Sequence, residues 1–142
     1  NDINIVCVDI QSSSTSIFKF KYFQESNISD VVYSDPLNYL YEPSSAILKA
    51  GAFKSVTKFY DVKKLAQSSH IYTSNSFVND FQGRKFRIDK VVPFSSKCVK
   101  SLFKTIPSAN ITIRNFPLKV EELRKKLKIK DGGEHYIFAT TE

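Results

Sequence analysis

Few side chains in this sequence have the types and spacings that catalysis or metal binding requires. The histidines, His70 and His135, each stand where a strand is predicted to begin, without a second ligand at metal-binding spacing. The cysteines, Cys7 and Cys98, are too few and too far apart for the paired ligands of a zinc site. We therefore predict no catalytic residue and no metal ligand, and interpret these four side chains as structural.

The glycines also fail to form a nucleotide-binding loop. Such loops space their glycines as GxGxxG or GxxxxGK, so that backbone amides can approach phosphates. Here Gly51 and Gly83 stand alone, and Gly132 is followed only by Gly133. We therefore expect no cofactor in this chain, and an independent enzyme is the least favoured interpretation.

Basic side chains are the remaining functional signal. The net charge of +7 is uneven: residues 1–45 hold two lysines and six acids, for a charge of −4, and the remainder carries +11. This charge distribution is typical of proteins that bind polyanions, although a lysine-rich helix is more often a solvated surface. The basic groups are Lys63-Lys64, Arg84-Lys85-Arg87, Lys97-Lys100-Lys104, Arg114, and the cluster at 124–130 that contains Arg124, Lys125 and Lys126.

Hydrophobic periodicity predicts the elements that position these groups. Residues 3–10 and 17–23 are expected to form a β-hairpin, whose second strand alternates aromatic residues with lysines. Residues 27–41 lose periodicity and are predicted to be a connecting loop. One long helix is expected from Glu42-Pro43 to Tyr60, because apolar residues recur there every three or four positions.

Strands and helices alternate in the rest of the chain. The predicted strands are 70–73, 84–92, 109–114 and 135–141, and the predicted helices are 96–106 and 118–129. The second of these helices is expected to end at Asp131-Gly132-Gly133. Together the elements predict an α+β fold, in which an N-terminal β-hairpin precedes a layered α/β module with a mixed sheet.

Three stretches of the sequence resemble one family. They are Glu42-Pro43-Ser44-Ser45-Ala46-Ile47-Leu48-Lys49-Ala50-Gly51, then His70-Ile71-Tyr72-Thr73-Ser74 with Asp80-Phe81-Gln82-Gly83-Arg84, and Asn110-Ile111-Thr112-Ile113-Arg114-Asn115-Phe116-Pro117 continuing to Asp131-Gly132-Gly133. They resemble the C-terminal region of bacterial class I S-adenosylmethionine-dependent methyltransferase-like proteins, where a small ferredoxin-like piece precedes a THUMP-like domain. Gln82 departs from the proline expected in that family.

The resemblance implies a domain organisation. Residues 1–33 would be a β-hairpin that ends the sheet of an upstream methyltransferase domain, residues 34–72 a ferredoxin-like linker piece with one main helix, and residues 73–142 a THUMP-like domain. The chain begins with Asn1 instead of methionine, and we expect it to be part of a longer protein. S-adenosylmethionine would then belong to the parent protein and not to this fragment.

The resemblance also implies a function. THUMP-type domains hold structured RNA, so the chain would be a non-catalytic, RNA-binding module that holds tRNA or rRNA for its own methyltransferase domain. The implied phosphate contacts are Arg84, Lys85, Arg87, Arg114, Lys125 and Lys126, with a hydrogen bond from Asn115. The alternative is a structural module that docks on its methyltransferase domain or on an acidic protein partner. Two cysteines and no long apolar run lead us to expect a cytoplasmic protein without membrane association.

The segment Asn115-Phe116-Pro117-Leu118 partly resembles the Asn/Asp-Pro-Pro-aromatic loop of amino-methyltransferases. Phe116 replaces the first proline of that loop and Leu118 replaces the aromatic residue. We therefore interpret the segment as a strand-to-helix turn in which Phe116 packs into the core and Pro117 prepares the helix.

Overall fold

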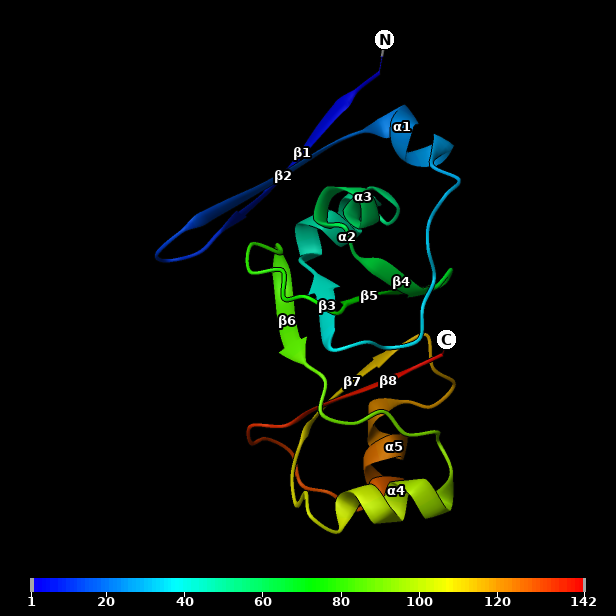
Figure 1. Ribbon diagram of the computed structural model, residues 1–142. Coiled ribbons are helices and arrows are strands. Elements are labelled where there is room, and N and C mark those ends of the chain that lie inside the picture. The colour runs from blue at the N-terminus through cyan, green and yellow to red at the C-terminus, as the bar shows by residue number, and fades with distance from the viewer. Residues whose placement is uncertain (1, 142) are drawn as a thin grey trace. The chain divides into compact units, whose positions relative to one another are not determined.

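The computed structural model describes residues 2–141. The chain divides into two compact units with the bounds Asn1–Asp89 (unit 1) and Lys90–Glu142 (unit 2). Figure 1 shows helices and strands in both units, so the predicted α+β class is confirmed. Parallel and antiparallel pairing both occur, but they lie mainly in separate sheets. Two antiparallel sheets belong to unit 1, where Tyr33 adds a single parallel bridge to Lys64, and one parallel pair belongs to unit 2.

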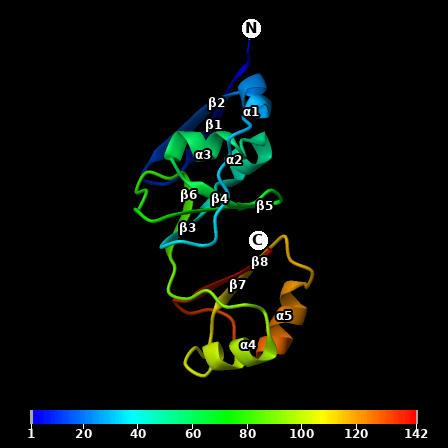
Figure 2. The same ribbon diagram turned by 45° about the vertical axis from the view of Figure 1, so that its right-hand side comes forward.

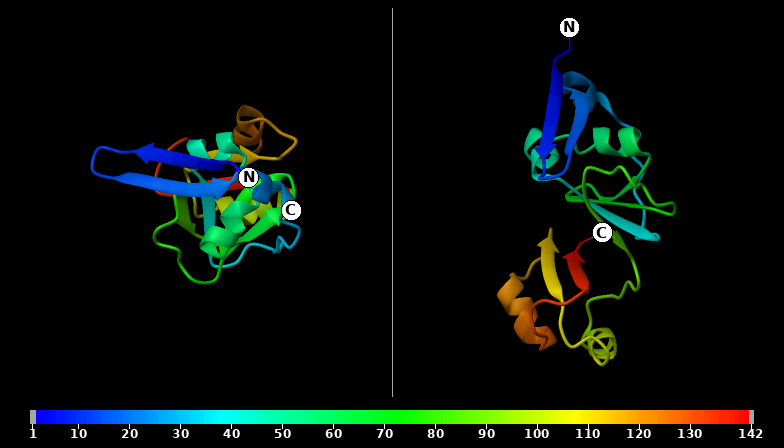
Figure 3. Two further views of the ribbon diagram at one scale, coloured as in Figure 1. Left: turned by 90° about the horizontal axis from the view of Figure 1, so that it is seen from above. Right: turned by 90° about the vertical axis from the view of Figure 1, so that its left-hand side faces the viewer.

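Unit 1 begins with the predicted β-hairpin. Strands β1 (Asn4–Ile10) and β2 (Thr15–Lys21) pair antiparallel over their whole length, as the long ribbon in Figure 3 shows. Because side chains alternate along a strand, one face of the hairpin turns Cys7, Phe18 and Phe20 into the core. The opposite face is exposed.

The second sheet of unit 1 has four antiparallel strands in the order β4-β5-β3-β6. Their bounds are β3 Tyr39–Pro43, β4 Lys63–Ala66, β5 Ser69–Ser74 and β6 Gly83–Arg87. The strands predicted at 70–73 and 84–92 are confirmed, although the second is shorter than expected. Strand β3 lies at the end of the predicted loop 27–41, and β4 was not predicted.

Three short helices complete unit 1: α1 (Tyr22–Asn27), α2 (Ser45–Ala50) and α3 (Ser55–Tyr60). The prediction of one long helix from Glu42 to Tyr60 is wrong in its extent. Ser44 caps α2 as a helix start should, but Gly51 follows in the left-handed region at φ 75°, and its N–H closes on the carbonyls of Ile47 and Leu48. The chain therefore turns before α3 begins.

Helices α2 and α3 lie between the hairpin and the four-stranded sheet (Figures 1 and 2). Phe18 from the hairpin, Ile47 and Val56 from the helices, and Tyr41 and Tyr72 from the sheet are all fully buried in the same cluster. This three-layered packing makes the hairpin an integral part of the unit 1 core.

Unit 2 contains α4 (Ser96–Phe103), β7 (Asn110–Arg114), α5 (Val120–Leu127) and β8 (Tyr136–Thr140). Strands β7 and β8 pair in parallel, and α5 is the crossover between them. Both helices contribute to a core around Leu123 and Leu127. The order α4, β7, α5, β8 agrees with the helices and strands predicted for this part of the chain. Helix α5 ends earlier than expected, because Lys128 already adopts the left-handed conformation at φ 54°.

Across residues 2–141, no helix has the length and apolar character that crossing a bilayer would require.

Candidate functional site

Three of the five candidate basic residues of unit 1, Arg84, Lys85 and Arg87, lie on strand β6. Arg84 donates to the Glu42 carboxylate at 3.0 Å, and its guanidinium lies 5.5 Å from the centre of the Phe86 ring. Lys85 points to the other face of the strand, where its ammonium donates to the Asn79 carbonyl at 2.8 Å. These cations are already engaged with groups of unit 1, and they do not form one continuous basic face.

Arg87 and Lys63 are the two remaining exposed candidates of unit 1. Arg87 donates to the Asp89 carboxylate at 3.3 Å, and both side chains are largely exposed. Lys63 begins β4, where it pairs with Thr73. An exposed ion pair of this kind contributes little to stability, so Arg87 can exchange Asp89 for another anion at small cost.

Lys64 lies in the interior of unit 1. It is 2% exposed, and its ammonium donates to the carbonyls of Ala66 at 2.7 Å and Gln67 at 2.6 Å. Burial lowers the pKa of Lys64 to about 8, against a smaller opposing effect of Glu25. These two hydrogen bonds stabilise the turn between β4 and β5, and the buried ammonium is not placed to reach a ligand at the surface.

The positive charge of the chain is concentrated in unit 2. Eleven basic and five acidic side chains give unit 2 a net charge of +6, and ten basic and nine acidic side chains leave unit 1 at +1. On α5, Lys125 and Lys126 are exposed, and Arg124 donates to the Asp131 carboxylate at 3.2 Å. Helix α5 is therefore the strongest candidate among the predicted basic groups.

Arg114 and Asn115 occupy the turn that leads from β7 towards α5. Asn115 has a left-handed backbone at φ 55°, which asparagine tolerates better than most residues, and its carbonyl accepts the N–H of Thr141 at 3.1 Å. Phe116 packs against the unit 2 core, as predicted for a strand-to-helix turn. Helix α5 begins at Val120, so Pro117 precedes the helix and does not start it.

An aromatic residue near this turn was missed in the sequence. Phe94 is 51% exposed and makes an edge-to-face contact with Phe116, with 5.3 Å between ring centres and 84° between ring planes. The ammonium of Lys126 lies 6.0 Å from the centre of the Phe94 ring. The only signal in the sequence is a phenylalanine between Pro93 and the polar start of a helix, in a basic segment.

The outer face of the hairpin carries a row of exposed aliphatic side chains. Val6, Val8, Ile10 and Ile17 are between 44% and 81% exposed, and Val8 lies directly opposite Ile17 in the strand register. Lys19 faces Val6 on the same side. A contiguous aliphatic surface on a folded domain commonly marks a region that packs against another structure.

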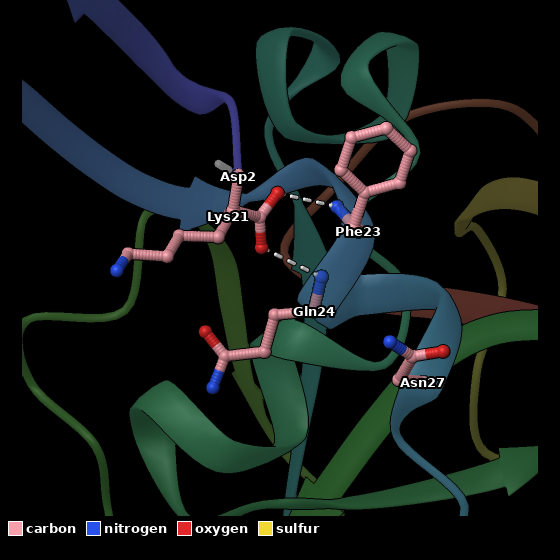
Figure 4. A pocket seen from close by; sticks show the side chains of 5 residues that line it. All are labelled: Asp2, Lys21, Phe23, Gln24 and Asn27. Atoms are coloured by element: carbon pink, nitrogen blue, oxygen red, sulfur yellow. Dashed lines mark hydrogen bonds between the residues drawn. The ribbon is translucent and has the colours of Figure 1, made fainter.

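The hollow in Figure 4 lies where the chain enters α1. Asp2, Lys21, Phe23, Gln24 and Asn27 line it, and the Asp2 carboxylate accepts the N–H groups of Phe23 at 2.7 Å and Gln24 at 3.0 Å. Desolvation acts to raise the pKa of Asp2, but these hydrogen bonds and Lys21 outweigh it and lower the pKa. Asp2 therefore caps the N-terminus of α1. Because the N–H groups of Phe23 and Gln24 already donate to Asp2, they are not available to bind an anion in the hollow.

His70 and Cys7 are both packed within unit 1. His70 stacks on Phe53 with 3.6 Å between ring centres, and burial, aided by Lys64, lowers its pKa. Cys7 is buried, and burial, with a smaller contribution from Asp9, raises the pKa of its thiol. Within residues 2–141, no three side chains of histidine, cysteine, aspartate or glutamate are grouped as a metal site needs.

Two stretches of the chain match known domain families. Residues 39–81 match the family described as a ferredoxin-like domain, and residues 83–142 match the family described as THUMP domain-like. The chain therefore contains a ferredoxin-like domain followed by a THUMP-like domain, in agreement with the resemblance of the sequence.

One solved structure is similar over nearly the whole chain. It is the crystal structure of a protein from Porphyromonas gingivalis W83 that is provisionally assigned as a methyltransferase. The match has 40% sequence identity and a TM-score of 0.89, and it covers 97% of this chain and 34% of that protein. The chain thus spans about a third of its structural relative. No curated protein matches the sequence significantly.

Proposed function

We propose that this chain, built from a ferredoxin-like and a THUMP-like domain, is a non-catalytic RNA-binding module of a larger methyltransferase-like protein. The single observation that supports it most is the net charge of +6 on unit 2, which contains nearly all of the THUMP-like match. RNA phosphates attract such a surface whatever the base sequence. The module would hold structured RNA, such as tRNA or rRNA, by its shape and backbone.

The proposed contacts are the exposed cations of unit 2. Lys125 and Lys126 would bind phosphates, and Arg114 with Asn115 would contribute from the turn after β7. Arg124 would reach a phosphate by giving up the exposed carboxylate of Asp131. On unit 1, Lys63, Lys85 and Arg87 could add outlying contacts, and Arg84 would need to leave Glu42. Lys64 drops out of the set because it is buried.

In this proposal, the methyl donor S-adenosylmethionine is bound by an upstream methyltransferase domain of the parent protein. Residues 1–33 would complete the sheet of that domain. The aliphatic outer face of the hairpin supports this arrangement, since Val8 and Ile17 would be buried by the added structure. A cytoplasmic location, where tRNA and rRNA are modified, is part of the same proposal.

The hairpin also favours a second candidate function, in which the chain is a docking module for its own methyltransferase domain or for an acidic protein. In that case, the basic face of α5 would bind carboxylates instead of phosphates. Charge reversal at Lys125 and Lys126 would then break the domain association and leave RNA binding unchanged.

Salt dependence of RNA binding tests the proposed function. The affinity of the chain for tRNA is measured by fluorescence anisotropy at several salt concentrations. We expect log Kd to rise steeply and linearly with log salt, because each neutralised phosphate releases bound cations. A flat salt response, or no binding at low salt, would remove the proposal.

A further inference from the structure

We propose that Phe94 and Lys126 form a binding site for one unpaired nucleotide, in which the base stacks on the phenyl ring and the adjacent phosphate binds the ammonium. This inference deepens the proposed function and rests on it. It adds the requirement that the bound RNA contain an unpaired base, which the charge of unit 2 alone does not require.

The first argument is the position of the ring. Isolated exposed phenylalanines are ordinary on protein surfaces, but Phe94 is held in place. Its backbone is the centre of a tight turn, because the N–H of Ser95 donates to the Pro93 carbonyl at 2.9 Å. Ser95 then caps α4, where its side-chain oxygen accepts the N–H of Cys98 at 3.3 Å. The backbone that carries the ring is therefore fixed in a turn before any ligand arrives, which lowers the entropic cost of binding.

The second argument is the support beneath the ring. Phe116 contacts Phe94 edge-to-face and itself packs against the unit 2 core. About half of the Phe94 surface stays exposed in this arrangement. An aromatic residue that is anchored on one side and open on the other resembles the stacking platforms by which proteins hold unpaired bases.

The third argument is charge. The Lys126 ammonium lies 6.0 Å from the Phe94 ring centre, near the outer limit of a cation–π contact, so leaving the ring costs it little. A base stacked on Phe94 would bring its phosphate within reach of this exposed lysine. The net charge of unit 2 favours a polyanion over a neutral apolar partner.

The chain contains no tryptophan, so the Phe94→Trp variant introduces a unique fluorophore at the proposed site. The probes are a short single-stranded RNA and a blunt-ended paired stem, which is formed by two complementary strands of the same length and contains no loop. We expect the single strand to quench the indole fluorescence at saturation and the paired stem to quench it little. Strong quenching by the paired stem, or none by the single strand, would overturn the inference.

The Phe94→Leu variant provides the matching affinity measurement. Loss of one stacked base predicts a decrease of about 10-fold in affinity for the single strand, with little change for the paired stem. The matched control is Phe77→Leu, since Phe77 is 49% exposed but lies in unit 1. Circular dichroism verifies that both variants are folded, and the Phe94→Trp result stands even if Phe94→Leu unfolds.

The outcomes separate the inference from the proposed function. If the natural chain binds neither RNA, both fail together. If it binds both RNAs with a steep salt dependence, but Phe94→Leu binds the single strand as the natural chain does, the proposed function stands and the nucleotide site is wrong.

Discussion

The Glu25 carboxylate accepts the backbone N–H of Ser55 at 2.7 Å, which joins helix α1 to the start of α3. Both oxygens also accept the N–H of Lys54 at 3.1 Å. The first turn of α3 has no cap of its own, because Lys54 makes no side-chain hydrogen bond to it. A residue thirty positions earlier in the chain therefore supplies the cap.

Removal of this cap should destabilise unit 1. We expect Glu25→Ala to lower the free energy of unfolding by about 1 kcal/mol, the usual cost of losing an N-cap. Urea unfolding followed by tyrosine fluorescence measures it, since six of the seven tyrosines lie in unit 1. Gln24→Ala, on the same helix, is the control and should change little. Equal effects of both variants would mean that the cap does not matter.

A side chain at Gly83 should disrupt the sheet of unit 1. Gly83 has φ 150°, and a Cβ there would lie 2.1 Å from the Glu42 carbonyl oxygen on the neighbouring strand. We expect Gly83→Ala to cost about 3 kcal/mol or more, because strand β6 must separate from β3. Gly51→Ala is the matched control: it also has a positive φ, but no atom within 4 Å of the added Cβ, and it should cost about 1 kcal/mol. Thermal unfolding of the two variants compares them, and equal costs would contradict the steric argument.

Buried Lys64 should make stability depend on alkaline pH. Its pKa is about 8 in the folded protein and near 10.5 in the unfolded chain, so between these values the unfolded state binds more protons. Stability from this group therefore rises as the pH increases from 8 to 10.5. Lys64→Met removes the titration but keeps a long side chain.

The measurement is the difference in unfolding free energy between the natural chain and Lys64→Met across that pH range. Cys7 and Tyr60, whose pKa values burial raises, titrate in both proteins and cancel in the difference. The unfolding free energy of the natural chain should increase relative to that of Lys64→Met as the pH rises. A constant difference would show that Lys64 titrates normally.

The lysines of α5 should account for part of the salt dependence of RNA binding. We expect the double variant Lys125→Ala with Lys126→Ala to reduce the slope of log Kd against log salt by about 2, one for each lost phosphate contact. The control is Lys19→Ala with Lys49→Ala, which removes the same charge from the surface of unit 1. If both double variants reduce the slope equally, binding reports net charge and not a defined surface on α5.

Unit 2 was predictable from the sequence because its signals are local. Leu123 and Leu127 repeat at helical spacing and β7 and β8 are short apolar strands, so pattern alone identifies the elements. Unit 1 was harder to predict. Strand β3 is buried along nearly its whole length and shows no alternation, and α3 depends on a cap from Glu25 that is remote in sequence.

The candidate site was predictable in the same uneven way. The charge of Lys125 and Lys126 is visible in the sequence, and their exposure follows from the apolar stripe on the opposite face of α5. In the sequence, Lys64 cannot be distinguished from the exposed lysines, and only the tertiary structure shows that it is buried. Phe94 acquires its significance from Phe116 and Lys126, which lie 22 and 32 positions later in the chain.

The aliphatic outer face of the hairpin has a practical consequence for any solution study of the isolated chain. Two copies could shield Val8 and Ile17 from water by placing their hairpins back to back, and Lys19 and Lys21 would oppose that contact by charge repulsion. We therefore expect weak, concentration-dependent dimers that high salt strengthens. High salt also weakens phosphate contacts, so self-association and RNA binding both change with salt. Analytical ultracentrifugation at each salt concentration therefore has to accompany the RNA titrations, so that the two effects can be separated.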